Sequence, residues 1–446
     1  MQKYFLAIFL SIGLFFVFAG DVKAAAIENS VCLDGVCTYS TLTSAIGATS
    51  VSSTVTTTAT YNGEGETFPW TMATSGVSVD CSASDAILNN NGASEAVITL
   101  SANNITVQSC KFFWTKFTVT GDTNTVQNNT FTANSSSTIF FNGTAPTGGY
   151  AFNNTGLNGI SIDANNTRVV SNTVDIYVDT EALYDKGIII VGSGVGGRGI
   201  GNEISLNTIN NYLNTSYLSL IEVGTASSTI IASNTLRYNT ALGGAAIIID
   251  SDPVGALIYG NKITMPSNPA TLVSGIEIYP YVNVVRAEIY NNSINIPSTC
   301  ALEGGQCKGI RITDGNSMAG YNATFVTSTY NLIYANSSLT ESSHRWLSIE
   351  DESAEVAPIT IYEDYNGFYN INSAGYIGST VVSSTGGHTI NLDPILMSTV
   401  TSSANYLQPS PVSNYLDING SRDIGVYSGA RENTIYIDDD GVINYD

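Results

Sequence analysis

Basic residues are scarce in this chain. Its 446 residues include 15 lysines and arginines against 37 aspartates and glutamates, which gives a formal charge of -22 at pH 7. So acidic a protein repels phosphate backbones and anionic lipids, and neither nucleic acid nor a membrane surface is an expected partner. Polyanionic glycans such as pectin or alginate are disfavoured for the same reason, unless a local basic patch overrides the global field. Cations, neutral sugars and basic partner surfaces remain compatible with this charge.

Long apolar runs are missing beyond the first residues. An apolar run from Phe5 to Ala19 follows Lys3. It precedes the small-residue site Val22-Lys23-Ala24, so residues 1–24 have the three parts of a secretory signal peptide. No later stretch approaches the roughly 18 apolar residues of a spanning helix, so no membrane insertion is expected after signal removal. The protein is therefore predicted to be secreted, periplasmic or held at the cell surface.

Cysteine is limited to six residues, and export would place them in an oxidising compartment. They are Cys32, Cys37, Cys81, Cys110, Cys300 and Cys307. Proximity in the sequence favours joining the first pair and the last pair, which leaves the middle two for each other. That is one of 15 connectivities, and the pairing stays open at this point. No pair has C-x-x-C spacing, so a metal site is less favoured. No cofactor is expected, although calcium would suit an acidic surface.

What the chain does contain is a repeated phrase: a short aliphatic strand, a polar turn, then Asn followed two residues later by an apolar residue. The phrase reads Val169-Val-Ser-Asn172-Thr-Val174 and Ile204-Ser-Leu-Asn207-Thr-Ile209, for example. Spacings between these Asn residues run from 27 to 43, within or near the range of stacked repeats. Placed at one corner of each coil, each amide would hydrogen-bond the Asn above and below. The predicted structural Asn ladder comprises Asn129, Asn172, Asn207, Asn234, Asn261, Asn292, Asn331 and Asn366.

Between the Asn corners the pattern is strand-like. Ile160-Ser-Ile162, Ile247-Ile-Ile249 and Ile310-Arg-Ile312 show apolar residues at every second position, bounded by turn residues. Strands this short are not stable alone, but stacked at roughly 4.8 Å they bury a continuous interior. The sequence therefore predicts an all-β solenoid of stacked coils over 61–392.

A solenoid needs caps at its open ends. Residues 25–60 are predicted as the N-terminal cap. A short helix is expected within Thr38–Ile46, with Ser40 as its N-cap and with Leu42, Ala45 and Ile46 on one apolar face. Residues 393–446, which include Leu407-Gln-Pro-Ser-Pro411, are predicted as a proline-rich closing segment and tail.

A resemblance to a known family lies in the N-terminal segment Tyr39–Ile46, the coils with Asn at their corners, the phrase Asp364-Tyr-Asn-Gly-Phe-Tyr369 and the C-terminal Asp423-Ile-Gly425. In these features the chain resembles secreted parallel β-helix proteins of the pectate-lyase-like superfamily. The resemblance covers nearly the whole mature chain and implies that its coils form a right-handed parallel β-helix. It implies polysaccharide lyases, hydrolases and epimerases, and also adhesins and surface proteins without known activity. Neither His344 nor His388 stands in the Gly-His-Gly motif that similar hydrolases carry.

Candidate functional residues come from aligning the coils on their aliphatic strands. The alignment places Ile248, Glu277, Arg311 and Ser348 in one outward column and Asp250, Tyr279, Thr313 and Glu350 in the next. Asp252 and Tyr281 continue the outward alternation, and Asp314 follows in a turn. Carboxylates on neighbouring coils would then lie roughly 5 to 10 Å apart, the range that glycosidases use.

Three functions compete for this face. An exported protein that binds an extracellular or cell-surface polysaccharide is the main hypothesis, with Tyr279, Tyr281 and Asp252 as substrate-binding residues. A glycoside hydrolase or polysaccharide lyase would use Asp250, Glu277, Arg311, Asp314 and Glu350 as catalytic residues. A structural adhesin or surface protein would leave the same residues as a solvated face, with Glu277 and Arg311 paired across coils.

Overall fold

The structure is a computed structural model. It describes residues 30–89, 94–132, 136–177, 186–192, 198–213, 218–239, 243–267, 269–280, 285–301, 306–313, 324–339, 344–350, 359–372, 375–377, 381–385, 388–391, 393–394, 435–437 and 443–445. The predicted signal peptide lies outside these residues, as does nearly all of the predicted closing segment.

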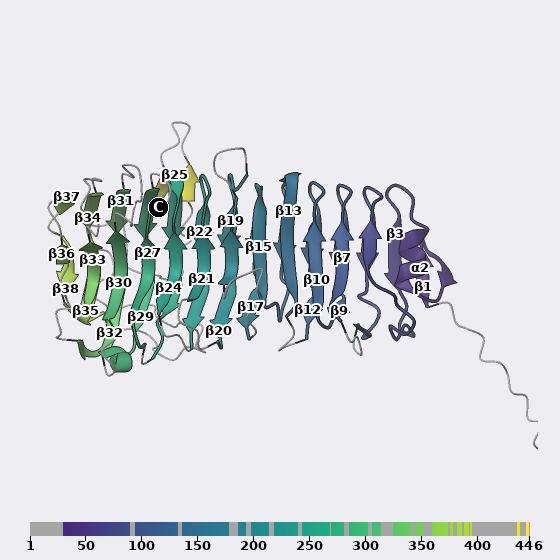
Figure 1. The fold of residues 1–446 in the computed structure, drawn as a ribbon, viewed down its shortest axis with the longest axis horizontal. Helices are drawn as coiled ribbons and strands as arrows, with labels where there is room; N and C mark the ends of the chain where they lie inside the picture. The colour runs from purple at the N-terminus through teal and green to yellow at the C-terminus, as the bar shows by residue number, and fades with distance from the viewer. Residues whose placement is uncertain are drawn as a thin grey trace, which may run out of the picture.

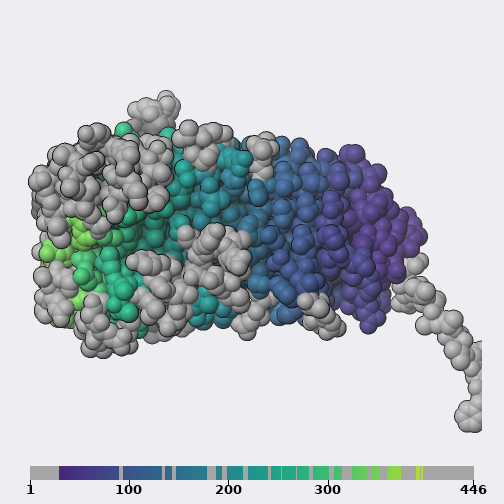
Figure 2. All heavy atoms as spheres, viewed as in Figure 1, coloured from purple at the N-terminus to yellow at the C-terminus, as the bar shows by residue number. Residues whose placement is uncertain are grey.

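The chain winds into a right-handed parallel β-helix, so the predicted fold is confirmed (Figure 1). The space-filling view in the same orientation shows one continuous rod (Figure 2). Three walls run along the rod, and from residue 54 to residue 391 consecutive strands of the chain belong to different walls. Over that range each strand pairs in parallel with the strand one coil away. The first strand of the chain, at residues 31–33, instead forms antiparallel pairs with the strands at 36–39 and 54–57.

The first wall is a sheet that counts 15 strands within the described residues. In sheet order they are β2 (Val36–Tyr39), β1 (Val31–Leu33), β3 (Thr54–Thr57), β5 (Ser78–Asp80), β8 (Thr106–Gln108), β11 (Thr125–Gln127), β14 (Tyr150–Phe152), β16 (Arg168–Val170), β19 (Glu203–Ser205), β22 (Ile230–Ala232), β25 (Asp252–Tyr259), β28 (Val285–Tyr290), β31 (Thr324–Thr329), β34 (Ile359–Asp364) and β37 (Val381–Thr385).

The second wall is a sheet with 12 described strands. In order they are β36 (Gly375–Ile377), β33 (Arg345–Glu350), β30 (Gln306–Thr313), β27 (Leu272–Ile278), β24 (Gly244–Ile249), β21 (Leu218–Val223), β18 (Lys186–Ile190), β15 (Gly159–Asn165), β13 (Thr138–Thr147), β10 (Thr115–Val119), β7 (Ala96–Leu100) and β4 (Trp70–Met72).

The third wall consists of two smaller sheets. Described strands of the larger one are β17 (Thr173–Ile176), β20 (Thr208–Asn211), β23 (Thr235–Tyr238), β26 (Lys262–Thr264), β29 (Ser293–Ile296), β32 (Leu332–Leu339), β35 (Gly367–Ile371) and β38 (Ile390–Asn391). Those of the smaller one are β12 (Thr130–Phe131), β9 (Lys111–Phe112) and β6 (Ile87–Leu88). A short 3-10 helix, η1 (Ser298–Ala301), follows β29, and an antiparallel hairpin pairs β39 (Ile435–Ile437) with β40 (Ile443–Tyr445).

The core is a set of inward columns, because side chains on every second strand position point into the rod. In the 15-stranded sheet one such column stacks aliphatic residues that are all fully buried. Its members are Val107, Val126, Ala151, Val169, Ile204, Ile231, Ile258 and Ile289. Each larger member contributes about 1.5–3 kcal/mol through burial, so the stacking of many weak strands makes the rod stable.

The Asn ladder forms at the corner between the 15-stranded sheet and the third wall. Asn261, for example, donates from Nδ2 to Ile231 O and to Asn292 Oδ1, at 2.9 Å each, and its Oδ1 accepts from Asn234 N at 3.0 Å. The left-handed backbone conformation belongs to the residue before each ladder Asn, such as Leu206 (φ 58). The ladder positions therefore require Asn for the hydrogen bonds of its buried amide, and not for a left-handed backbone conformation in the turn.

One rung of the ladder escaped the sequence pattern. Asn154 lies between Asn129 and Asn172, accepting from the first and donating to the second, and it divides the longest spacing into 25 and 18 residues. Its phrase, Asn153-Asn154-Thr155, repeats the wording of Asn128-Asn129-Thr130. Cys110 occupies the first position of the ladder, and its backbone N donates to Asn129 Oδ1 at 3.0 Å.

At the N-terminal end the helix α2 (Leu42–Gly47) packs against β1, β3 and β4 and buries Leu42, Ala45 and Ile46, the face that was predicted. Its N-cap is Thr41, not Ser40 as predicted, because Thr41 has the extended backbone from which its hydroxyl accepts Ser44 N at 3.2 Å. The three disulfides join the cysteines in the favoured order, Cys32–Cys37, Cys81–Cys110 and Cys300–Cys307.

Candidate functional site

The predicted outward columns exist on the 12-stranded sheet. Strand pairing places Glu277 beside Arg311 and Arg311 beside Ser348 on β27, β30 and β33. One position further on, Thr313 lies beside Glu350. The periodic sequence therefore aligns residues that are far apart in the chain, as the alignment of aliphatic strands predicted.

Within these columns Arg311 links the two acids. Its Nη1 donates to Glu277 Oε1 at 2.6 Å, and its Nε donates to Glu350 Oε2 at 2.9 Å. Lys308 Nζ lies 3.7 Å from Glu350 Oε1, which also accepts from Ser348 Oγ at 2.7 Å. We call Glu277, Lys308, Arg311, Ser348 and Glu350 the Arg311 cluster. Each carboxylate of the cluster is therefore held by at least one cation.

The Arg311 cluster is buried, contrary to the expected solvated face. Glu277 is 8% exposed, Arg311 7% and Lys308 3%. Burial by itself would raise the pKa of Glu350, but the Ser348 hydroxyl and the charges of Arg311 and Lys308 lower it below its ordinary value. Burial lowers the pKa of Lys308, against the opposing charge of Glu350. These low exposures leave a polymer no access to the cluster. The alternation of side chains along a strand predicts which ones point away from the core, but not whether they reach solvent.

The other predicted site residues are not part of this cluster. Asp250 and Tyr279 are half-buried and follow directly after β24 and β27. Asp252 is fully buried, and its carboxylate accepts Ser228 N and Thr229 N at 3.1 Å each. The predicted outward position of Asp252 is wrong because the chain turns a corner there and Asp252 begins β25 in a different sheet. Asp314 and Tyr281 lie outside the described residues.

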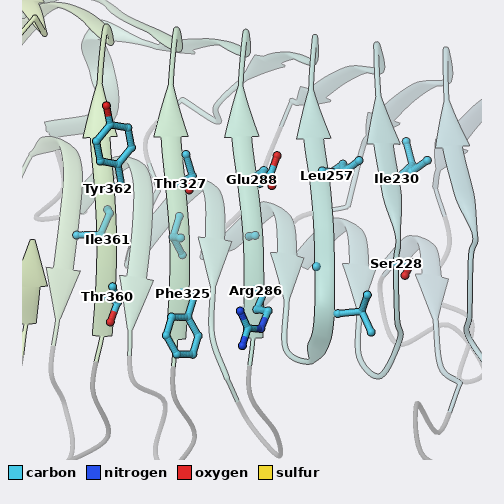
Figure 3. Close-up of a pocket in the computed structure, with 14 residues that line it drawn as sticks. Ser228, Ile230, Leu257, Arg286, Glu288, Phe325, Thr327, Thr360, Ile361 and Tyr362 are labelled. Atoms are coloured by element: carbon cyan, nitrogen blue, oxygen red, sulfur yellow. The ribbon is translucent and has the colours of Figure 1, made fainter. Parts of the chain in front are cut away.

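An open groove lies instead on the outer face of the 15-stranded sheet, across β22, β25, β28, β31 and β34 (Figure 3). Its volume is about 610 Å³. Strand pairing arranges its lining in two rows that cross the strands. The Glu288 row consists of Ile230, Leu257, Glu288, Thr327 and Tyr362. The Arg286 row consists of Arg286, Phe325 and Thr360.

The groove presents ring, hydroxyl and charged groups to solvent. Tyr362 is 43% exposed, and in the described chain its ring is not stacked on another ring. The Arg286 guanidinium lies 4.6 Å from the centroid of the Phe325 ring and covers one face of it. Elsewhere on the rod, outward tyrosines stack on each other, as do Tyr177 and Tyr212 with centroids 4.4 Å apart. Tyr362 therefore offers the ring face that those stacked tyrosines give to their neighbours.

Alignment on the Ile-x-Ile strands directed the sequence prediction to the other sheet and missed this groove. The signal was present in Val285-Arg-Ala-Glu-Ile289, which alternates buried and exposed residues. The same alternation recurs in Phe325-Val-Thr327 and Thr360-Ile-Tyr362. Stacking these three strands in register would have placed both rows on one face.

The described lining of the groove does not contain the pair of carboxylates that glycoside hydrolysis ordinarily uses. Glu288 is the one carboxylate among its described lining residues, whereas glycoside hydrolysis ordinarily uses two. In the part of the chain that the structure describes, no three His, Cys, Asp or Glu side chains are grouped to hold a metal ion. No helix in that part is long and apolar enough to cross a membrane.

Comparison with family models, with curated proteins and with solved structures gives no match to this chain.

Proposed function

We propose that this is an exported protein of the pectate-lyase-like β-helix type, which binds an extracellular or cell-surface polysaccharide without cleaving it. The observation that carries the proposal is the open groove on the 15-stranded sheet, with the exposed ring of Tyr362 beside hydroxyl and charged side chains. Sugar sites combine apolar surfaces with a few polar groups that fix orientation.

The shape of the groove favours a polymer over a small molecule. Five neighbouring strands contribute to it, and four spacings of about 4.8 Å extend it over roughly 19 Å along the rod. The rows repeat at the strand spacing, so successive units of a chain would meet successive strands. A polysaccharide that lies along the rod axis fits this arrangement.

Binding without cleavage is favoured by the placement of the acids. The groove contributes one carboxylate, Glu288, whereas the buried Glu277 and the half-buried Glu350 are both hydrogen-bonded to Arg311. The hydrolase alternative would need a second acid in the groove. Export is supported by the three disulfides and by the signal-like residues 1–24.

The groove is tested by replacing its exposed ring. Tyr362→Ala should weaken binding of the mature protein to a responsive polysaccharide by about tenfold, since a ring contact contributes roughly 0.5–1.5 kcal/mol beyond its buried area. Tyr212→Ala is the matched control, because Tyr212 is 46% exposed and lies outside the groove lining. Affinity electrophoresis over a polysaccharide panel measures both variants.

Equal losses in the two variants, or none in Tyr362→Ala, would place binding elsewhere. Assays for new reducing ends and for unsaturated products on the same panel test the alternative of an enzyme. Product formation that purified protein sustains would overturn the noncatalytic proposal. A protein that binds nothing on the panel would instead favour the structural adhesin.

A further inference from the structure

The central strand of the groove carries two opposite charges. Arg286 and Glu288 are both exposed, lie two residues apart on β28, and so project from the same face about 6.7 Å apart along the strand. Figure 3 shows them on opposite sides of the groove. One belongs to the Arg286 row and the other to the Glu288 row.

Neither charge is neutralised by the described chain. Glu288 has Leu257 and Thr327 as its neighbours in the row, and it forms no ion pair or hydrogen bond with any described side chain. Arg286 is directed toward Phe325, not toward Glu288, and has no carboxylate partner within the described residues. The Arg311 cluster shows that this fold does pair its charges where they serve stability.

We infer that the ligand is a zwitterionic polysaccharide, whose repeating unit carries both an ammonium and a carboxylate group. This inference rests on the proposed function of the groove. The ammonium would meet Glu288 and the carboxylate would meet Arg286. A polyanion would be opposed by Glu288 and by the net charge of -22. A polycation would be attracted by that net charge but opposed within the groove by Arg286. A neutral chain would hydrogen-bond the two groups through its hydroxyls but would form an ion pair with neither.

Four probes of matched length test the charge class. They are N-deacetylated hyaluronan, which is zwitterionic, hyaluronan, which is anionic, chitosan, which is cationic, and N-acetylchitooligosaccharide, which is neutral. Titration of the mature protein at low ionic strength should show the zwitterionic chain binding about tenfold more tightly than the neutral one, from two exposed ion pairs worth about threefold each. High salt should remove most of that preference.

Two charge variants measure separately how much Glu288 and Arg286 contribute to the preference for the zwitterionic chain. Glu288→Gln should lose about threefold for the zwitterion and should shift the ranking toward hyaluronan, while Arg286→Gln should shift it toward chitosan. Glu203→Gln is the matched control, since it removes an acid from the same sheet outside the groove lining. It should leave the ranking of the four probes unchanged.

The outcomes separate the inference from the proposed function. Equal binding of all four probes that Tyr362→Ala weakens would leave the function standing and overturn the zwitterionic inference. A preference for the zwitterion that Glu203→Gln reduces as much as Glu288→Gln would overturn it too, because the global field would then be responsible. A protein that binds none of the probes, nor any member of the wider panel, would overturn both.

Discussion

The outer faces of the two large sheets obey the same alternation rule and differ in what surrounds the charges. On the 12-stranded sheet, Arg311 is 7% exposed and bonds two carboxylates. On the 15-stranded sheet, Arg286 is exposed and touches a ring. Charges that are withdrawn from water need partners, whereas exposed charges can remain without them. The first face is therefore a structural element and the second a candidate for binding.

The largest expected effect comes from the same substitution made on each face. Arg311→Met would leave the buried Glu277 without its cation and the half-buried Glu350 with Lys308 alone, and should cost about 3–5 kcal/mol of unfolding free energy. Arg286→Met should cost about 1 kcal/mol or less, the contribution of an exposed cation–π contact. Chemical denaturation of both variants measures the difference.

Similar losses in the two arginine variants would contradict the contrast between the faces. A second outcome would also be informative: if Arg311→Met gains stability when Glu277 and Glu350 are both changed to Gln, the uncompensated carboxylates are the cause of the loss.

A smaller loss is expected from a buried polar group without charge. Asn261→Ala removes a side chain that bonds Ile231 O, Asn292 Oδ1 and Asn234 N. Each group left unsatisfied costs about 1–3 kcal/mol, and partial relaxation should bring the total to about 2–3 kcal/mol. If thermal unfolding shows a loss below about 0.5 kcal/mol, the ladder guides register without stabilising the rod.

The stabilising contribution of Glu350 in the Arg311 cluster should also depend on pH. The pKa of Glu350 is lowered in the folded protein, so its contribution to stability is present above the unfolded pKa, about 4.3, and is lost as the pH falls through the folded value. Unfolding curves between pH 7 and pH 3 should therefore be flatter for Glu350→Gln than for the native protein. A variant as acid-sensitive as the native protein would show that other carboxylates dominate.

The sequence predicted the fold and the register because both follow from a period that short apolar strands repeat many times. That period placed Glu277, Arg311 and Ser348 side by side without any structure. It could not predict that this face is buried, since burial depends on contacts beyond the strand itself. Nor could it place Asp252, because alternation is lost where the chain passes from one sheet to the next.

The candidate groove was missed for a different reason. Its strands alternate as regularly as those of the other sheet, but their outward residues are Arg286, Phe325 and Tyr362 and not a row of acids. A search for paired carboxylates therefore passed over them. The lesson is that outward columns must be compared on every sheet before one is chosen by its chemistry.

The smallest expected change in unfolding free energy tests whether the groove is a binding surface or a second structural cluster. Glu288→Gln removes an exposed carboxylate that has no described partner, so the free energy of unfolding should change by no more than about 0.5 kcal/mol. Differential scanning calorimetry beside the native protein measures it. If the variant loses more than about 1 kcal/mol of unfolding free energy, Glu288 stabilises the fold. It would then not be available to a ligand, and this face would no longer differ from the Arg311 cluster.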